Sequence, residues 1–236
     1  MPTLRSILFW IGFYLSTIIV TSILSVSFIF PFRVRYGISR TWPFFNLWWL
    51  KITCGLSYQV QGFENIPDES VIFMSKHQST WETLTYQLFM PPMVWVLKRE
   101  LLWIPIFGWG VAMLNPIAIN RKSGKKALNQ LIDEGTSRLN SGISIMIFPE
   151  GTRTTAGEET HYRPGGALLA AKSGHKIVPI AHNAGYYWPK GQFYKHKGTI
   201  TVAIGEPIET KGKRASDILK EVETWIENKM LEIGGR

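Results

Sequence analysis

The chain has 236 residues, enough for one ordinary α/β domain with an additional segment. Hydrophobic residues make up 45% and charged residues only 18%, and the net charge of +9 favours a partner that carries phosphate. The single cysteine excludes an internal disulfide, and neither it nor the five histidines have the spacing of a zinc site, so we expect no metal. The sequence has no Gly-rich nucleotide-binding fingerprint, and we expect no bound cofactor.

The first predicted element is an uncharged apolar segment at residues 7–30, which is long enough to cross a bilayer core of roughly 30 Å. Three arginines follow it, at Arg33, Arg35 and Arg40. By the positive-inside rule the remainder of the chain is cytoplasmic. An aromatic cluster of the interfacial type comes next, at residues 42–50. We therefore expect residues 1–56 to anchor the chain in a membrane, either as one span or as a helical pair that dips into one leaflet.

Residues 57–236 are predicted to form an α/β domain with a central mixed β-sheet flanked by helices, because strands alternate with helices along this part of the chain. Strands are expected at 57–64, 71–74, 94–97, 117–119, 143–148, 177–181 and 199–204. Helices are expected at 84–89, at 165–173, and after caps at Ser123 and Ser216, and Pro179 is expected to interrupt its strand. Residues 102–110 are expected to form an apolar loop that lines an acyl pocket, touches lipid or belongs to the ordinary core.

The segment Ser75–Thr83 carries the strongest chemical signal, because it joins a predicted strand to a predicted helix and places Glu82 five positions after His77. A neutral imidazole can take a proton from an alcohol, and a nearby carboxylate can hold its other nitrogen. Ser79 and Glu82 also fit a capping box at positions N-cap and N3, so a purely structural interpretation stands beside the catalytic one.

Three cationic residues each follow the carboxyl end of a predicted strand, as His77 does: Lys98, Arg121 and Arg153. Ligands of open α/β sheets gather where the carboxyl ends of strands meet. Arg153 can bind a phosphate in a bidentate manner, and Gly151 lets the backbone come close to it. Together these residues predict an anionic substrate held beside His77, although each cation alone is more typical of a solvated surface.

Four blocks of the sequence resemble the motifs of the glycerophospholipid acyltransferases. His77-Gln-Ser-Thr-Trp-Glu82 resembles the first motif, His-x4-Asp, and the segment from Gly110 to Arg121 is similar to the second. Phe148-Pro-Glu-Gly-Thr-Arg153 matches the third motif closely, and Val178-Pro179-Ile180 the fourth. The order and spacing of the motifs agree over residues 57 to 208, and the apolar amino-terminal segment adds to a resemblance to bacterial 1-acylglycerol-3-phosphate acyltransferases.

This resemblance implies transfer of a fatty acyl group from acyl-CoA or acyl carrier protein to the sn-2 hydroxyl of lysophosphatidic acid, which forms phosphatidic acid in phospholipid biosynthesis. His77 would act as the base and Glu82 would orient it, as the candidate catalytic pair. The phosphate would be held by Arg153 first, then Lys98 and Arg121. The substrate loop is expected at Glu150, Gly151 and Thr152, and main-chain N–H groups near the His77 turn are the candidates for stabilising the oxyanion.

The resemblance further implies membrane lipids as partners and a location at the bacterial inner membrane with the catalytic domain in the cytoplasm. Two residues depart from the family pattern. Glu82 stands where Asp is usual, and Lys76 stands where many members have Asn. A cation beside His77 would disfavour the imidazolium and keep the base neutral at pH 7.

Several alternatives remain open at this stage. One alternative is an acyltransferase with another acceptor: lyso-ornithine lipid, glycerol-3-phosphate or another lysophospholipid. Another is a non-enzymatic lipid-binding protein, which would need no His–carboxylate pair. Neither the donor carrier nor the acyl-chain length is determined. No nucleic-acid partner is expected, because the basic residues are not interleaved with aromatic residues along one element.

Overall fold

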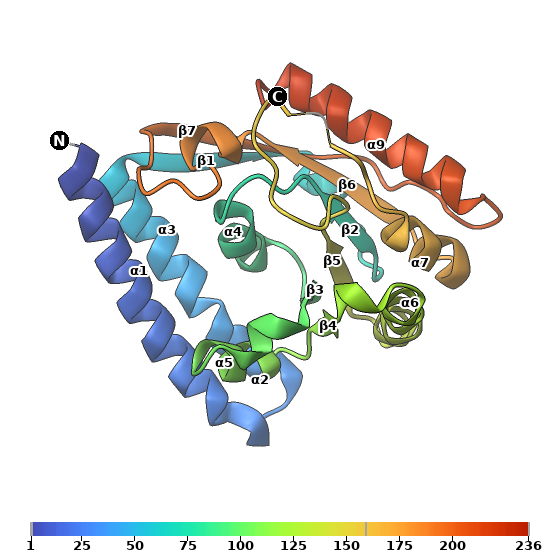
Figure 1. Cartoon of the computed structure of the whole chain (residues 1–236), viewed down its shortest axis with the longest axis horizontal. Coiled ribbons are helices and arrows are strands. Elements are labelled where there is room, and N and C mark those ends of the chain that lie inside the picture. The colour runs from blue at the N-terminus through green and yellow to red at the C-terminus, as the bar shows by residue number, and fades with distance from the viewer. Residues whose placement is uncertain (1, 159, 236) are drawn as a thin grey trace.

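The centre of the molecule is a β-sheet. The computed structural model describes residues 2–158 and 160–235. Its strands are β1 (Leu56–Gln61), β2 (Ile72–Ser75), β3 (Met93–Lys98), β4 (Ile117–Ile119), β5 (Ser144–Ile147), β6 (Ile177–His182) and β7 (Gly198–Ile204). They form one seven-stranded sheet in the order β1-β7-β6-β2-β5-β3-β4 (Figure 1). Most of these strands lie within one or two residues of their predicted positions.

The directions of the strands bring the predicted site residues to one edge. β6, β2, β5, β3 and β4 all run parallel to one another, whereas β7 is antiparallel to β6 and pairs in parallel with β1. The mixed sheet predicted from the sequence is therefore confirmed. Because the five parallel strands share one direction, the turns that follow β2, β3, β4 and β5 all leave from the same edge of the sheet.

Helices cover both faces of the sheet, and this explains why β2, β5 and β6 are buried along their whole length. The helices are α1 (Pro2–Ser25), α2 (Phe32–Ser39), α3 (Thr41–Cys54), α4 (Trp81–Phe89), α5 (Phe107–Ala112), α6 (Lys125–Asn140), α7 (Gly165–Ser173), α8 (Ala184–Tyr187) and α9 (Ala215–Glu232). One core cluster joins α1, α3 and α4 to the sheet, and a second joins α6, α7 and α9 to it. Figure 1 shows α1 and α3 side by side, far from α6 and α7.

Helix α1 is long and apolar enough over Thr3–Ser25 to cross a membrane, judged by length and composition alone. It packs against α3, where Asn46 Nδ2 donates to Ser16 Oγ at 2.9 Å. The predicted domain boundary at residue 56 falls between the end of α3 and the start of β1. Residues 1 and 236, which the predicted domains include, lie outside the described residues. Phe9 of α1 shares a core cluster with Trp81 of α4, so the segment packs on the sheet domain, and the division into two domains stays a prediction.

Residues 102–110 are not the loop that the sequence predicts. They contain the end of a 3-10 helix at Arg99–Trp103 and most of α5. The glycines there serve close packing: a Cβ added at Gly110 would lie 2.7 Å from Thr21 Cβ, so this residue lets α5 lie directly on α1. Ile106, with φ of 65°, turns the chain between the two helical pieces.

Three smaller expectations are also wrong. Ser123 does not cap α6, because Asn120 draws residues 121–123 into a 3-10 turn and the helix begins at Lys125. Ser216 lies inside the first turn of α9 and contacts Asp217. Pro179 does not interrupt β6, since it pairs with Met74 of β2 and its carbonyl accepts from the N–H of Gly205 at 2.9 Å.

Candidate active site

His77 and Glu82 are in contact on the turn between β2 and α4. His77 Nδ1 lies 2.8 Å from Glu82 Oε1, which is possible because His77 precedes the helix and Glu82 is in its first turn. The Glu82 side chain is fully buried, whereas 13% of the His77 side chain is exposed. With Nδ1 held by the carboxylate, Nε2 is the ring nitrogen left to meet a substrate.

Glu82 also organises the backbone of this turn. The same Oε1 accepts the N–H groups of Gln78 at 2.9 Å and Ser79 at 2.7 Å. The predicted capping box is only half formed, because Thr80 is the N-cap and Ser79 Oγ accepts from Trp81 N rather than from Glu82 N. The structural and catalytic interpretations of Glu82 therefore do not exclude each other, since one carboxylate oxygen serves both contacts.

A buried histidine that the sequence did not single out lies behind this pair. His182 Nε2 is 2.9 Å from the carbonyl oxygen of Lys76, and His182 Nδ1 accepts the N–H of Ala184 at 3.2 Å. These two contacts place a proton on Nε2, and burial lowers the pKa of His182. Its Nε2 lies 4.0 Å from Glu82 Oε2.

The environment of Glu82 favours its ionised form. Burial raises the pKa of this carboxyl, but the imidazoles of His182 and His77 and the N–H of Ser79 lower it by more, so the net shift is downward. A carboxylate in this state can orient a neutral imidazole and then stabilise the imidazolium that forms when His77 takes a proton.

The loop after β5 fixes His77 from the other side. The His77 ring stacks on Phe148, with ring centroids 3.9 Å apart and planes 10° from parallel. The His77 N–H donates to Glu150 Oε1 at 3.2 Å, and the His77 carbonyl accepts from Thr154 N at 2.8 Å. The ring, the N–H and the carbonyl of His77 are thus all held by contacts with residues 148–154.

These contacts narrow the main-chain candidates for stabilising the oxyanion. The main-chain N–H groups of His77, Gln78 and Ser79 all donate to the carboxylates of Glu150 and Glu82, so they are not free to stabilise an oxyanion. The sequence could not show that two buried carboxylates lie behind the turn and accept them.

The side chain of Glu150, the first residue of the predicted substrate loop, is buried and faces the His77 turn. Burial raises the pKa of its carboxyl to about 7, although Lys76 and the His77 N–H act to lower it. Gly151 has φ of 72°, a conformation that favours glycine, and its carbonyl accepts a hydrogen bond from Arg121. The predicted loop Glu150-Gly151-Thr152 is therefore ordered by contacts to the catalytic turn on one side and to Arg121 on the other.

A cavity of about 490 Å³ unites most of the predicted site residues. Its polar side is formed by His77, Lys98, Arg121, Thr152, Arg153 and Lys190. Its apolar side includes Val20, Leu24, Leu101, Phe107, Val111 and Leu114, which come from α1, α5 and the segments next to α5. One compartment thus places a basic imidazole and several cations against a wall suited to a hydrocarbon chain.

The cations on this cavity differ in how far they are already engaged. Lys98 Nζ lies 3.6 Å from Glu100 and is about half exposed, and Arg121 donates to Gly151. The buried Nε of Arg153 has no hydrogen-bond partner among residues 2–158 and 160–235. Lys190, on the turn after α8, was missed because a single lysine between proline and glycine carries no signal of its own. The roles of all these residues remain predictions.

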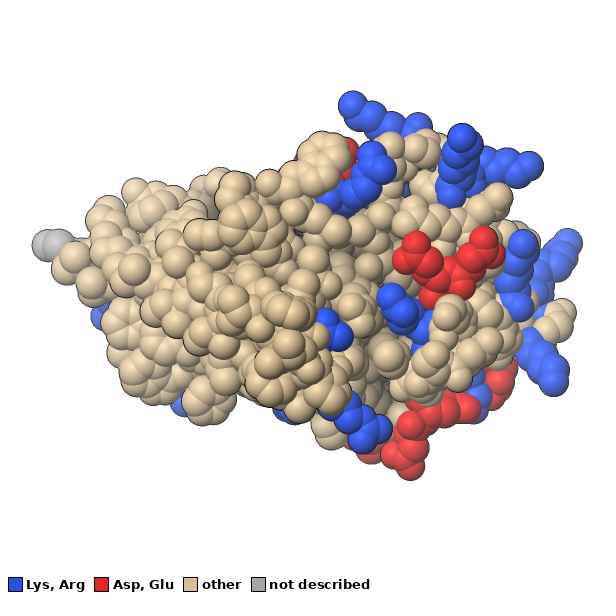
Figure 2. Space-filling view, turned by 90° about the horizontal axis from the view of Figure 1, so that it is seen from below, with Lys and Arg blue, Asp and Glu red and all other residues tan. Residues whose placement is uncertain are grey.

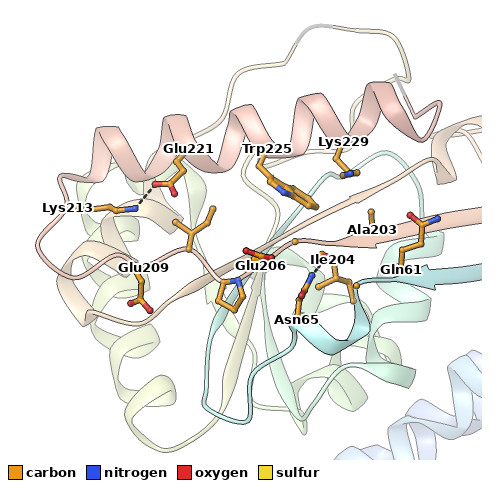
Figure 3. Close-up of a pocket in the computed structure, with 14 residues that line it drawn as sticks. Gln61, Asn65, Ala203, Ile204, Glu206, Glu209, Lys213, Glu221, Trp225 and Lys229 are labelled. Carbon is orange, nitrogen blue, oxygen red and sulfur yellow. Dashed lines mark hydrogen bonds and ion pairs between the residues drawn. The ribbon is translucent and has the colours of Figure 1, made fainter.

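A second cavity, of about 640 Å³, lies under α9 and holds none of the predicted site residues (Figure 3). Its acidic and basic side chains include Glu221 and Lys213, which pair with each other at 2.6 Å. Its position away from His77 gives it no part in the site. In the described part of the chain no group of three or more His, Cys, Asp or Glu side chains could hold a metal ion, and the expected lack of a cofactor stays a prediction.

Lys76 does not face the imidazole in the way that the sequence suggested. Its ammonium points into the interior and pairs with Glu227 of α9 at 2.6 Å. The expectation that this cation acts directly on His77 neglected the partner, which lies 151 positions further along the chain.

Comparison with known proteins agrees with this geometry. The sequence matches the acyltransferase family over residues 57–183, more than half of the chain. It is 45% identical over 209 residues to a 1-acyl-sn-glycerol-3-phosphate acyltransferase of Pseudomonas aeruginosa, covering 87% of this chain and 81% of that protein. It is 28% identical to the human 1-acyl-sn-glycerol-3-phosphate acyltransferase beta, with 72% of this chain and 62% of the human protein covered.

A solved structure shares the fold. The crystal structure of the 1-acyl-sn-glycerophosphate acyltransferase PlsC from Thermotoga maritima superposes with a TM-score of 0.83 and 22% sequence identity, and the match covers 100% of this chain and 97% of that one. The motif resemblance found in the sequence is confirmed by these matches. The chain therefore belongs to the acyltransferase family and is an O-acyltransferase.

Proposed function

We propose that this enzyme transfers a fatty acyl group from a thioester donor to the sn-2 hydroxyl of 1-acyl-glycerol-3-phosphate, which yields phosphatidic acid for phospholipid biosynthesis. The relative of Pseudomonas aeruginosa that is 45% identical carries this acceptor in its name. The observation that carries the proposal is the cavity in which the His77 imidazole, several cations and an apolar wall meet. A lysophosphatidate offers a hydroxyl, a phosphate and an acyl chain, and each has a counterpart there.

The chemistry follows from the His77–Glu82 geometry. The acceptor oxygen attacks the thioester carbonyl while its proton moves to His77 Nε2. The tetrahedral intermediate then collapses, the C–S bond breaks, and the departing thiolate takes the proton back from the imidazolium. No enzyme nucleophile is needed, because the thioester is already activated and the alcohol attacks it directly. The Glu82 carboxylate, 2.8 Å from Nδ1, keeps Nε2 directed at the acceptor and stabilises the imidazolium.

Positioning supplies the rest of the rate enhancement, since holding two reactants together can offset ~7–11 kcal/mol of the barrier. We assign the acceptor phosphate first to Arg153, whose buried Nε has no hydrogen-bond partner within the described residues, and then to Lys98 and Arg121. Glu150 and Thr152 hold and flank the Gly151 loop beside this phosphate. The acyl chains would lie against the apolar side of the cavity, where burial stabilises by ~0.8 kcal/mol per CH₂.

We expect Arg153→Ala to raise KM for lysophosphatidate by roughly 10- to 100-fold, because a hydrogen bond to a charged group contributes ~1.5–3 kcal/mol. The KM for a monoacylglycerol acceptor, which lacks the phosphate, should not change. Arg138→Ala is a matched control, since its Nε is likewise buried and unpartnered within residues 2–158 and 160–235, but the residue does not line the cavity. The test is to measure kcat and KM of the Arg153→Ala variant with both acceptors. If its activity falls equally with lysophosphatidate and with monoacylglycerol, Arg153 has a structural role.

The donor and the acceptor are tested together with the purified enzyme. Acyl-CoA and acyl carrier protein are supplied in turn as donors, and lysophosphatidate, lyso-ornithine lipid, glycerol-3-phosphate and other lysophospholipids as acceptors. The proposal expects lysophosphatidate to have the highest kcat/KM with at least one donor. If the chain binds lipid but forms no acylated product from any pair, the proposed reaction is wrong.

We place the enzyme on the cytoplasmic face of the bacterial inner membrane, with α1 and α3 lying in one leaflet. α1 contacts the sheet domain at separate points along its length: Trp10 Nε1 donates to the carbonyl of Phe193 at 3.0 Å, and Thr21 packs on Gly110. A helix held along a domain in this way lies beside it rather than projecting through a bilayer. Figure 2 shows charged residues gathered at one end of a face of the molecule, while the α1 side is nearly devoid of them.

Cysteine labelling separates the two membrane arrangements. With Cys54 replaced by alanine, single cysteines are introduced as Thr3→Cys and as Val26→Cys, near the two ends of α1 and both exposed. In sealed vesicles that carry the enzyme on the outside, a membrane-impermeant maleimide is expected to label both positions from outside. Labelling of one end only would support a single span.

A further inference from the structure

The two residues on either side of His77 are both anchored to α9 or to the turn that follows it. Lys76 Nζ lies 2.6 Å from Glu227 Oε1, which belongs to the second half of α9. Gln78 Nε2 donates to the carbonyl of Gly235 at 3.2 Å. The first contact joins residues that are 151 positions apart in the sequence, and the second joins residues that are 157 positions apart. The fold therefore places α9 directly behind the turn that carries His77.

Lys76 is buried and its ammonium is fully engaged. Only 3% of its side chain is exposed. Besides Glu227, Nζ lies 3.1 Å from Thr160 Oγ1 and 3.8 Å from Glu150 Oε1. Tyr162 closes the arrangement, because its hydroxyl donates to the same Glu227 oxygen at 2.9 Å. A buried ammonium is tolerated only where such partners are fixed, so the place of Glu227 determines the place of Lys76.

Through Glu150 this ion pair reaches the backbone of the base. Glu150 Oε1 faces Lys76 and also accepts the His77 N–H at 3.2 Å. On the other side of His77, the N–H of Gln78 is held by Glu82 while its side chain reaches Gly235. The backbone of the turn is therefore fixed at consecutive positions, and α9 supplies the outer contacts of that arrangement.

We propose that α9 positions the catalytic turn, and that it does so through Lys76 and Gln78, which act as positioning residues for His77. The proposal rests on the proposed role of His77 as the base. Misplacement of a catalytic group by about 1 Å can cost about 10²-fold in rate, so contacts that never touch the substrate have a measurable effect on turnover.

The decisive variant is Glu227→Gln, which keeps the shape of the side chain but removes the charge that holds Lys76. The freed ammonium is expected to move toward Glu150 and to draw this carboxylate away from the His77 N–H. We expect kcat to fall about 10-fold while KM for lysophosphatidate stays within about twofold of wild type. A structural role alone would lower the melting temperature without this split between kcat and KM.

The matched control is Glu221→Gln on the same helix. Glu221 pairs with Lys213 at 2.6 Å, the same distance as Lys76–Glu227, but it faces the cavity of Figure 3 and does not approach His77. Its replacement removes an ion pair of the same length that is more exposed than Lys76–Glu227, and it is expected to leave kcat within about twofold of wild type. Melting temperatures measured for both variants separate a loss of stability from a loss of turnover.

Two further variants test the same arrangement, and the first of them keeps the proposal testable if Glu227→Gln does not fold. Gln78→Met removes the donor to Gly235 at nearly constant volume and is expected to lower kcat about 10-fold through the second contact. Lys76→Gln combined with Glu227→Gln is expected to be no worse than either single variant, because both act through one contact.

The outcomes separate this proposal from the proposed reaction. If wild type transfers acyl groups and His77→Ala does not, but Glu227→Gln and Gln78→Met both keep wild-type kcat, then the positioning role is wrong and the base assignment stands. A rise in KM without a fall in kcat overturns it as well. If wild type forms no product, the proposed reaction itself has failed.

Discussion

His77→Ala is expected to lower kcat for acyl transfer by about 10²–10⁴-fold, the usual contribution of a general base. The expected loss is in turnover rather than in binding, because the phosphate and the acyl chains of the acceptor have other contacts in the cavity. The fold should persist, since the ring lies at the cavity wall and its main packing contact is the stack on Phe148, worth roughly 0.5–1.5 kcal/mol.

His77→Asn makes this test sharper than alanine alone. The asparagine amide can take the place of Nδ1 and keep a hydrogen bond to Glu82, but nothing replaces the Nε2 lone pair. If proton removal is the role of His77, this variant should be as inactive as His77→Ala. His196→Ala is the control, because this histidine is exposed and does not line the cavity. Initial rates of phosphatidate formation, with melting temperatures measured alongside, check the result, and near-normal turnover in either His77 variant would remove the base assignment.

Much of the fold could be predicted because its signals are local. Short apolar runs such as residues 71–74 became buried strands, and the small-residue helix Gly165–Ser173 ends at Gly174, which has φ of 71°. Residues 102–110 failed for the opposite reason. Their glycines suggested a loop, but Gly110 is needed for contact with Thr21, which is 89 positions earlier in the sequence, and no local pattern reveals such a contact.

The candidate site shows the same division. Sequence order placed His77, Lys98, Arg121 and Arg153 after strands, and parallel pairing of those strands brought them to one cavity. What lies behind the turn could not be predicted. His182 comes from β6 and contacts the Lys76 carbonyl across 106 positions. Partners of this kind are set by tertiary packing, and no local motif names them.

The arrangement also explains how one turn can be both rigid and reactive. Glu82 and Glu150 are carboxylates buried on opposite sides of His77, and together they accept its N–H, its Nδ1 and the next two N–H groups. Their environments differ: Glu82 has a lowered pKa, whereas burial raises the pKa of Glu150 to about 7. Glu82 therefore stays charged through the working range of pH and is the one suited to stabilise an imidazolium.

The second large effect is expected for Glu82→Gln, which should lower kcat by at least about 10²-fold, since loss of the orienting carboxylate in a Ser-His-Asp triad costs about 10⁴-fold. The amide oxygen can still accept the N–H groups of Gln78 and Ser79, so the turn keeps its backbone contacts. It carries no charge, however, and so it cannot stabilise the imidazolium. Glu82→Asp keeps the charge but is shorter by one methylene, so we expect a smaller loss.

The pH dependence of stability gives an independent measurement for the same variants. A carboxyl whose pKa is lowered on folding stabilises the fold above its ordinary value of 4.5, and this stabilisation is lost as the pH falls further. The difference in melting temperature between wild type and Glu82→Gln should therefore shrink as the pH is taken below that value. If Glu82→Gln and Glu82→Asp instead show equal, small losses of kcat and differ from wild type only in melting temperature, then Glu82 serves the helix and not the base. The catalytic interpretation of the His77–Glu82 pair would then have to be given up. Among the described residues of this turn, no carboxylate other than Glu82 is within reach of His77 Nδ1 to take over its role.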